Sequence, residues 1–154
     1  MIKKIRLIII LLVIFILVVT IGLIINKNKN NDKHKTLTEK FYVPIKNSYN
    51  IIQFKNVTGD YSERCCYSEI KISEKDYNNF ELEIKKSGYV KEPLEWYDIF
   101  IENNSDWISN ENIIAVYTKH IVETQYIIKR NRIQINIFIT ESEDGYRQIY
   151  MLRN

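Results

Sequence analysis

The hydrophobic residues of this chain follow two different patterns. From Leu7 to Ile25 the chain runs for nineteen residues without a charge, and only Thr20 and Gly22 among them are not strongly apolar. Beyond Phe41, apolar residues occur in short segments in which they alternate with polar ones. A run of the first kind predicts a membrane-spanning helix, whereas segments of the second kind predict strands that are buried on one face.

The apolar run has the dimensions of a membrane span. At ~1.5 Å of rise per residue, residues 7–25 form a helix of roughly 28 Å, close to the ~30 Å thickness of the hydrocarbon core of a bilayer. The strongly apolar residues together favour insertion by roughly 5 to 10 kcal/mol. We therefore expect a transmembrane helix at residues 7–25, preceded by a basic tail at residues 1–6.

The same run could act as a cleaved secretory signal, because the leader MIKKIR is short and basic. The nearest small-x-small cleavage motif is Thr20-Ile21-Gly22, and three more apolar residues follow it directly. A peptidase needs an exposed, extended segment at that point, so an uncleaved anchor is the preferred interpretation. A helix buried in a soluble core is the third alternative, and it is disfavoured because eighteen or more consecutive apolar residues are rare there.

The charges that flank the run do not decide the topology, because both sides are basic. The flanking basic residues are Lys3, Lys4 and Arg6 before the run, and Lys27, Lys29, Lys33 and Lys35 after it, offset by Asp32. The positive-inside rule therefore gives almost a tie. A short basic leader followed at once by an apolar helix resembles an uncleaved signal. We accordingly expect a single-pass protein of the cell membrane whose C-terminal domain is extracytoplasmic, and the reverse orientation stays open.

Charge is divided unevenly between the two parts of the chain. The net charge is +3, but residues 1–36 hold seven basic residues and one acidic residue, whereas residues 37–154 hold 15 basic and 18 acidic residues. An acidic domain disfavours nucleic-acid binding. Residues 26–36 are rich in Asn and Lys and lack apolar periodicity, which predicts a basic flexible linker. The expected partners are the lipid bilayer, including anionic head groups beside this linker, and a protein at the envelope.

Residues 37–154 are long enough for a single domain. Its first elements are expected to be a hairpin of strands at 51–57 and 64–72, followed by a helix. Ser73 stands three residues before Asp76, as in a capping box, and apolar residues at helical spacing continue as far as Gly88. This pattern predicts an amphipathic helix that lies on the sheet with one side in water.

The last forty residues predict an antiparallel meander. Strands are expected at 113–117, 121–128, 133–140 and 146–152, with turns at KRNR and ESEDG. In the third of these segments, four isoleucines share one face by the two-residue period, which predicts a sheet that is buried on one side. The segment 89–101 is left open between a short strand and a helical turn, and 103–112 is expected to be a loop. The fold class is thus a single N-terminal transmembrane helix plus a small α+β domain, mainly antiparallel sheet with one principal helix.

The adjacent cysteines Cys65 and Cys66 are the most unusual chemical feature. They could form a vicinal disulfide or bind a soft metal, but neighbours on a strand point to opposite faces. The simpler interpretation is one buried and one exposed thiol. His120 could serve as a base for either thiol only if the fold brings them together, and it is more often a packed or surface residue. We expect no metal and no cofactor, because neither metal-ligand spacing nor a phosphate-binding glycine loop is present.

A second candidate site is the aromatic cluster around Trp96, Tyr97 and Asp98. Aromatic faces with nearby carboxylates, here including Glu92 and Glu95, are found in carbohydrate-binding clefts, although the ordinary interpretation is a core patch with solvated acids beside it. Trp107 is expected to fold back as a cap on the core. We take these three residues and Trp107 as the ligand or partner candidates, with Cys65 and Cys66 as the redox candidates.

These observations favour a small membrane-anchored domain of binding or interaction type at the bacterial cell envelope. The sequence contains no catalytic constellation that would make the protein an enzyme. The main alternative is a membrane-anchored enzyme or thiol-active protein that uses Cys65 or Cys66 with His120. A third alternative is a tether whose function lies in the span itself.

Overall fold

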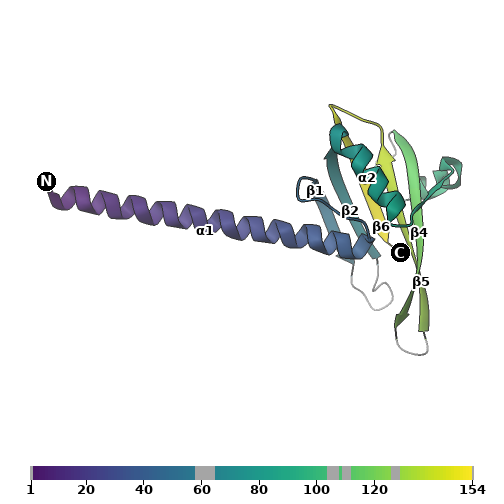
Figure 1. Ribbon diagram of the computed structural model, residues 1–154, viewed down its shortest axis with the longest axis horizontal. Coiled ribbons are helices and arrows are strands. Elements are labelled where there is room, and N and C mark those ends of the chain that lie inside the picture. The colour runs from purple at the N-terminus through teal and green to yellow at the C-terminus, as the bar shows by residue number, and fades with distance from the viewer. Residues whose placement is uncertain (1, 58–64, 104–107, 109–111, 126–128, 154) are drawn as a thin grey trace.

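A long helix extends away from an α+β domain in the computed structural model, which describes residues 2–57, 65–103, 108, 112–125 and 129–153 (Figure 1). The helix, α1, runs from Ile2 to Phe41 without interruption. The remaining elements build a six-stranded antiparallel sheet and one principal helix, α2 (Glu74–Lys86). This confirms the expected fold class, an N-terminal apolar helix followed by a small α+β domain.

The sheet is antiparallel throughout, and its strand order is β1-β2-β6-β5-β4-β3. The strands are β1 (Asn50–Val57), β2 (Cys65–Ser73), β3 (Val90–Glu92), β4 (Ile113–Gln125), β5 (Lys129–Thr140) and β6 (Tyr146–Arg153). The predicted hairpin of β1 and β2 is confirmed. The last strand, β6, lies between β2 and β5, so the C-terminal residues are in the middle of the sheet.

The predicted amphipathic helix is confirmed as α2. Its N-cap is Ser73, whose hydroxyl oxygen accepts a hydrogen bond from the backbone N–H of Asp76 at 3.2 Å. Gly88 follows the helix with a positive φ of 80°, a conformation that glycine adopts without strain. Phe80 and Ile84 of α2 are fully buried in the larger of two cores, which also contains the isoleucines of one face of β5.

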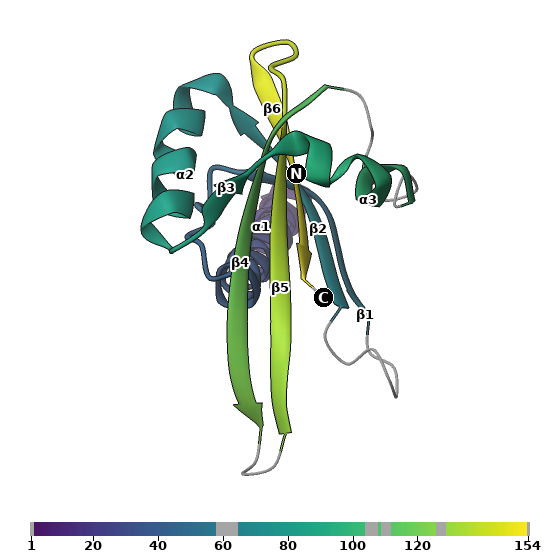
Figure 2. The same cartoon turned by 90° about the vertical axis from the view of Figure 1, so that its right-hand side faces the viewer.

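The opposite face of the sheet is also covered, which corrects the expectation of a sheet buried on one side only. A 3₁₀ turn, η1 (Leu94–Trp96), and a short helix, α3 (Asp98–Asn103), lie over this face, opposite α1 (Figure 2). They close a smaller core in which Phe138 and Val116 are fully buried. Sequence periodicity missed this second core because the covering segment is irregular and its packing depends on distant strands.

The β4–β5 hairpin differs from the predicted strand boundaries. The predicted strand 113–117 and residues 121–125 of the predicted strand 121–128 are parts of one strand, β4, and residues 126–128 lie outside the described residues. The KRNR segment lies in β5 and not in a turn. The polar residues Thr118 to His120 do not end the strand, because each pairs with a residue of β5. Thr118 also donates a hydrogen bond to Asn136 Oδ1 at 3.0 Å, which satisfies a polar group inside the sheet.

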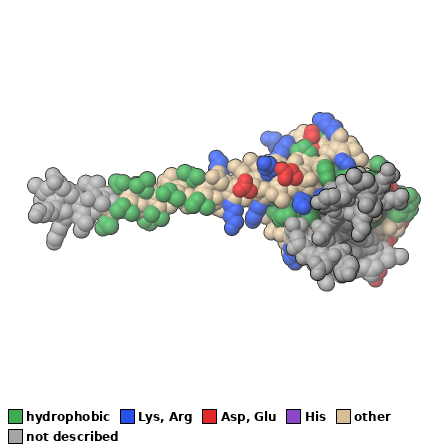
Figure 3. Space-filling model, turned by 90° about the horizontal axis from the view of Figure 1, so that it is seen from below, with side chains coloured by type: hydrophobic (Ala, Val, Ile, Leu, Met, Phe, Trp, Pro, Cys, Tyr) green, Lys and Arg blue, Asp and Glu red, His purple; other side chains and the backbone are tan. Residues whose placement is uncertain are grey.

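Residues 26–36 are helical, in contrast to the flexible linker that was expected. They belong to α1, which connects the apolar run directly to the domain. His34, Leu37 and Phe41 are buried, and this i, i+3, i+7 spacing places them on one side of the helix. The pattern escaped sequence analysis because it crosses the predicted boundary between linker and domain. Figure 3 shows hydrophobic side chains along the outer part of α1 and basic ones nearer the domain.

A hydrogen bond from Tyr117 to Glu81 ties α2 to the sheet, and it predicts a pH-dependent contribution to stability. This bond lowers the pKa of Glu81 below its ordinary value; burial opposes the shift, and Lys85 adds to it. Because the folded pKa is depressed, the contribution is present above the unfolded pKa of about 4.3 and is lost as the pH falls through the folded value. Tyr117→Phe should therefore cost about 1–2 kcal/mol at pH 7 and less at pH 3.

Urea denaturation at both pH values measures this difference. Glu81→Gln is the matched control, because its side chain still accepts a hydrogen bond from Tyr117 but does not titrate. In the Glu81→Gln background, the cost of Tyr117→Phe should be the same at pH 7 and pH 3. A pH-independent cost in the presence of Glu81 would contradict the prediction.

Candidate functional site

The aromatic cluster predicted as a ligand or partner site is divided by the fold. Trp96, at the end of η1, exposes 70% of its surface. Tyr97 instead packs inward, where its hydroxyl lies 2.6 Å from Thr118 Oγ1 and its ring meets Phe138 edge to face. Asp98 is exposed at the start of α3. Trp107 lies outside the described residues. The surface candidates that remain are therefore Trp96 and Asp98, whereas Tyr97 belongs to the smaller core.

Cys66, one of the two predicted nucleophiles, is not brought to the predicted base, His120. Cys66 is buried in the larger core, and the side chain of Cys65 lies outside the described part of the chain. Strand pairing places Cys66 in one row with Lys119, three strand spacings or about 14 Å away. His120, the next residue, is exposed and faces the other side of the sheet. Cys66 and His120 therefore cannot share a proton directly.

Sequence analysis missed the joint between α1 and the domain. We call this region the junction, meaning residues 34–49 with the side chains that contact them. Leu37 and Phe41 of α1 are fully buried in the larger core, together with Val43, Ile45 and Tyr49 of the loop that follows. The last two turns of the helix are thus as much part of the hydrophobic core as α2 is.

The C-terminal end of α1 is satisfied by side chains from distant strands. The last carbonyl groups of a helix lack partners within the helix. Arg153 Nη1 donates to the carbonyl of Lys40 at 3.0 Å, and the hydroxyl of Tyr89 donates to the carbonyl of Phe41. Burial raises the pKa of Tyr89 well above its ordinary value, which keeps the proton on that hydroxyl. The end of α1 is therefore held by a charge-assisted hydrogen bond from Arg153 and by a buried hydrogen bond from Tyr89.

Two cations gather where α1 ends. Tyr42, the first residue after the helix, has a φ of 52°, the left-handed conformation of a helix-terminating residue. Its ring lies 5.4 Å from Lys119 Nζ and 5.7 Å from the Arg153 guanidinium. Positive charge at this position also complements the negative end of the helix dipole. The arrangement stabilises both the end of the helix and its position on the sheet.

His34 is the one histidine at the junction, and it is 2% exposed. Its Nδ1 lies 2.8 Å from the carbonyl oxygen of Asn30, and its Nε2 lies 2.9 Å from the carbonyl oxygen of Tyr49. Nearby, the hydroxyl of Thr38 accepts a hydrogen bond from the backbone N–H of Ile45 at 2.9 Å. These contacts bind the loop 42–49 back onto α1.

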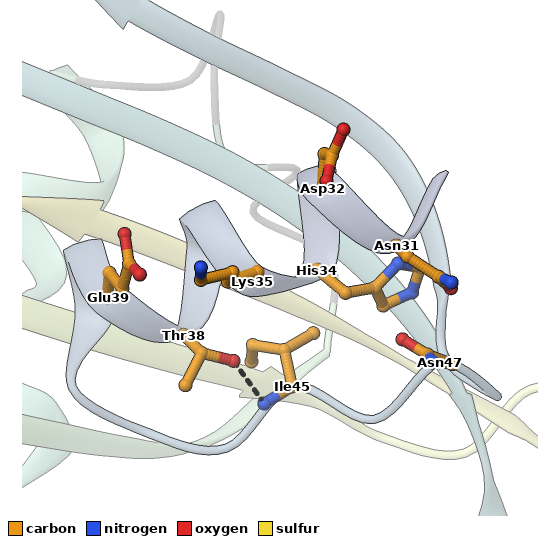
Figure 4. Close-up of a pocket in the computed structure, with 8 residues that line it drawn as sticks. All are labelled: Asn31, Asp32, His34, Lys35, Thr38, Glu39, Ile45 and Asn47. Carbon is orange, nitrogen blue, oxygen red and sulfur yellow. Dashed lines mark hydrogen bonds between the residues drawn. The ribbon is translucent and has the colours of Figure 1, made fainter. Parts of the chain in front are cut away.

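A shallow groove runs along this part of the junction (Figure 4). Its charged side chains are Asp32, Lys35 and Glu39, all from α1, and the facing loop contributes the uncharged Ile45 and Asn47. One ammonium beside two carboxylates does not select an anion, and the groove is open to solvent. Among the described residues, no group of three or more His, Cys, Asp or Glu side chains is placed to hold a metal ion. The side chains that line this groove therefore give no argument for a bound anion or metal ion.

Comparisons with protein-family models, with curated proteins and with solved structures find no match to this chain. The structure itself carries the functional argument. It has a helix that is long and apolar enough to cross a membrane, and that helix ends in a junction with the domain.

Proposed function

We propose that the protein is a single-pass membrane protein of the bacterial envelope that holds a binding domain at a fixed height and orientation over the bilayer. The observation that carries this proposal is the continuity of α1. One helix begins with apolar side chains that are exposed from Leu11 to Ile25 and ends with Leu37 and Phe41 inside the domain core. A domain on a flexible linker would need neither feature.

The length of the helix between these two parts sets the height of the domain. His34, the first buried residue after the apolar run, follows Ile25 by nine residues, which is roughly 14 Å of helix. The head-group layer of a bilayer is about 5–8 Å thick on each side. Lys27, Lys29 and Lys33 lie in this interval and suit anionic head groups. The domain would accordingly stand roughly 6–9 Å beyond the head-group layer.

The surface that we propose for partner binding is the η1–α3 segment with Trp96. It lies on the face of the sheet opposite α1, so the membrane anchor does not cover it (Figure 2). Tryptophan is enriched among the residues that dominate protein interfaces, and a tryptophan 70% exposed is free to serve in this way. We place this domain on the extracytoplasmic side, as the basic leader favours.

Site-specific photocrosslinking in native membranes tests this proposal. A photoreactive amino acid at position 96 should form a discrete crosslinked product of higher mass. The matched control is the same substitution at Val122, which is 59% exposed in the β4–β5 hairpin. Val122 should give no such product. Equal crosslinking at both positions, or none at position 96, would argue against a partner at the η1–α3 segment.

A further inference from the structure

The two hydrogen-bonding partners of His34 have a consequence for its protonation. Both ring nitrogens face backbone carbonyl oxygens, those of Asn30 and Tyr49, at 2.8 and 2.9 Å. A carbonyl oxygen only accepts, and a neutral imidazole has a single N–H. The neutral ring therefore leaves one nitrogen lone pair against a carbonyl oxygen in a site that is 2% exposed. Only the imidazolium donates to both.

We infer that protonation of His34 locks the junction, so that the attachment of α1 to the domain responds to pH. One of the two bonds stays within α1, since Asn30 precedes His34 by one turn. The other crosses to the loop 42–49 and, beside the bond between Thr38 and Ile45, fastens the loop to the helix. Loss of the Nε2 proton removes the donor to the loop, and loss of the Nδ1 proton sets a lone pair against the carbonyl oxygen of Asn30; either change destabilises the ring in this position. Histidine is the side chain whose charge ordinarily changes between pH 5 and 8.

The charges around His34 are compatible with a positive ring. From α1, the groove beside it contains the carboxylates of Asp32 and Glu39 and the ammonium of Lys35. From the facing loop come only the uncharged Ile45 and Asn47. Tyr49 is neutral as well, because burial, with smaller contributions from Asp76 and Glu83, raises its pKa to about 12. No cation from the facing loop lines this groove to oppose the imidazolium.

This inference concerns the junction alone and holds whichever partner the domain binds. The groove of Figure 4 has mixed charge and is open to solvent, and the buried amide of Asn136 lies in the polar network of the smaller core. His34 differs from them because its geometry distinguishes two protonation states of one named group.

The experiment uses the full chain in lipid nanodiscs with His120→Gln, which leaves His34 as the only histidine. Nitrogen-15 NMR of the ring reports how many ring nitrogens carry a proton. Hydrogen exchange of the amides of residues 37–41, expressed as protection factors to remove the intrinsic effect of pH, reports how firmly the end of α1 is held. We expect two protonated nitrogens at pH 5, one at pH 8, and about five- to tenfold greater protection at pH 5.

The matched variant carries His34→Gln in the same background, because glutamine keeps a donor but does not titrate. Its protection factors should be equal at pH 5 and pH 8. A single neutral tautomer at both pH values would overturn the inference, and so would a pH dependence of protection that survives in His34→Gln. If His34→Gln fails to fold, the ring nitrogen signals of the His120→Gln protein still decide. Partner crosslinking at position 96 is a separate measurement, so either proposal can fail without the other.

Discussion

The Phe41→Ala variant should lose about 3–5 kcal/mol of unfolding free energy. Phe41 is the last residue of α1 and is fully buried in the larger core. Removing its ring leaves a cavity between the helix and the sheet, and the surrounding residues can close it only in part. Domains of this size are stable by about 5–15 kcal/mol, so this one substitution at the end of the membrane helix would remove a large share of the total.

Chemical denaturation of the full chain in detergent micelles, followed by near-ultraviolet circular dichroism of the tyrosines, measures this loss. The matched control is Leu82→Ala, which also truncates a large apolar side chain, but on the exposed side of α2. The control should change stability by less than about 0.5 kcal/mol. If Phe41→Ala changed the free energy of unfolding as little as this control does, the end of α1 would not belong to the core. The domain would then be joined to the helix by a flexible linker, as the sequence had suggested.

A second large effect is expected in the apolar part of α1. The double substitution Ile16→Arg with Leu17→Arg places two charges near the middle of the predicted span. Each arginine costs about 2.5–3.5 kcal/mol at that depth, and the apolar residues that it replaces no longer contribute. The sum is about 6–8 kcal/mol, comparable to the whole favourable insertion energy of the run. We therefore expect the variant to be released from membranes.

Carbonate extraction followed by intact mass measurement tests this prediction. The wild-type chain should stay in the pellet at its full translated mass, and the variant should appear in the supernatant. Leu82→Arg with Val122→Arg is the control, since it adds the same charge at exposed apolar positions of the domain. That control should stay in the pellet. A wild-type protein that has lost about twenty N-terminal residues would instead identify the run as a cleaved signal.

Sequence periodicity predicted those elements in which one face is buried and the other is wet. The helix α2 and the isoleucine face of β5 are examples, because a single contrast between core and water produces a regular pattern. Sequence periodicity failed to predict the strand boundaries where one segment contacts two different environments. The polar residues Thr118 to His120 looked like the end of a strand, yet their pairing with β5 keeps β4 continuous through Gln125.

The residues of the candidate sites were likewise predictable only in part from the sequence. Exposed Trp96 and half-buried Tyr97 are neighbours in the chain, and no sequence pattern told them apart, because their positions depend on how η1 packs over Phe138. His34 was assigned to a flexible linker, since its only partners outside its own helical turn lie in the loop that ends at Tyr49. Arg153 and Tyr89 gave no signal at all, as their partners are backbone carbonyls at the end of α1.

The sequence by itself determined that the chain has an apolar helix long enough to span a membrane and an acidic α+β domain behind it. Both follow from composition and short-range periodicity, which depend on contrast with water or lipid and not on particular partners. Only the tertiary structure decided that the helix continues into the domain core, that Cys66 and His120 lie apart, and that His34 faces two carbonyl oxygens. These features depend on contacts between residues far apart in the chain, which a linear pattern does not record.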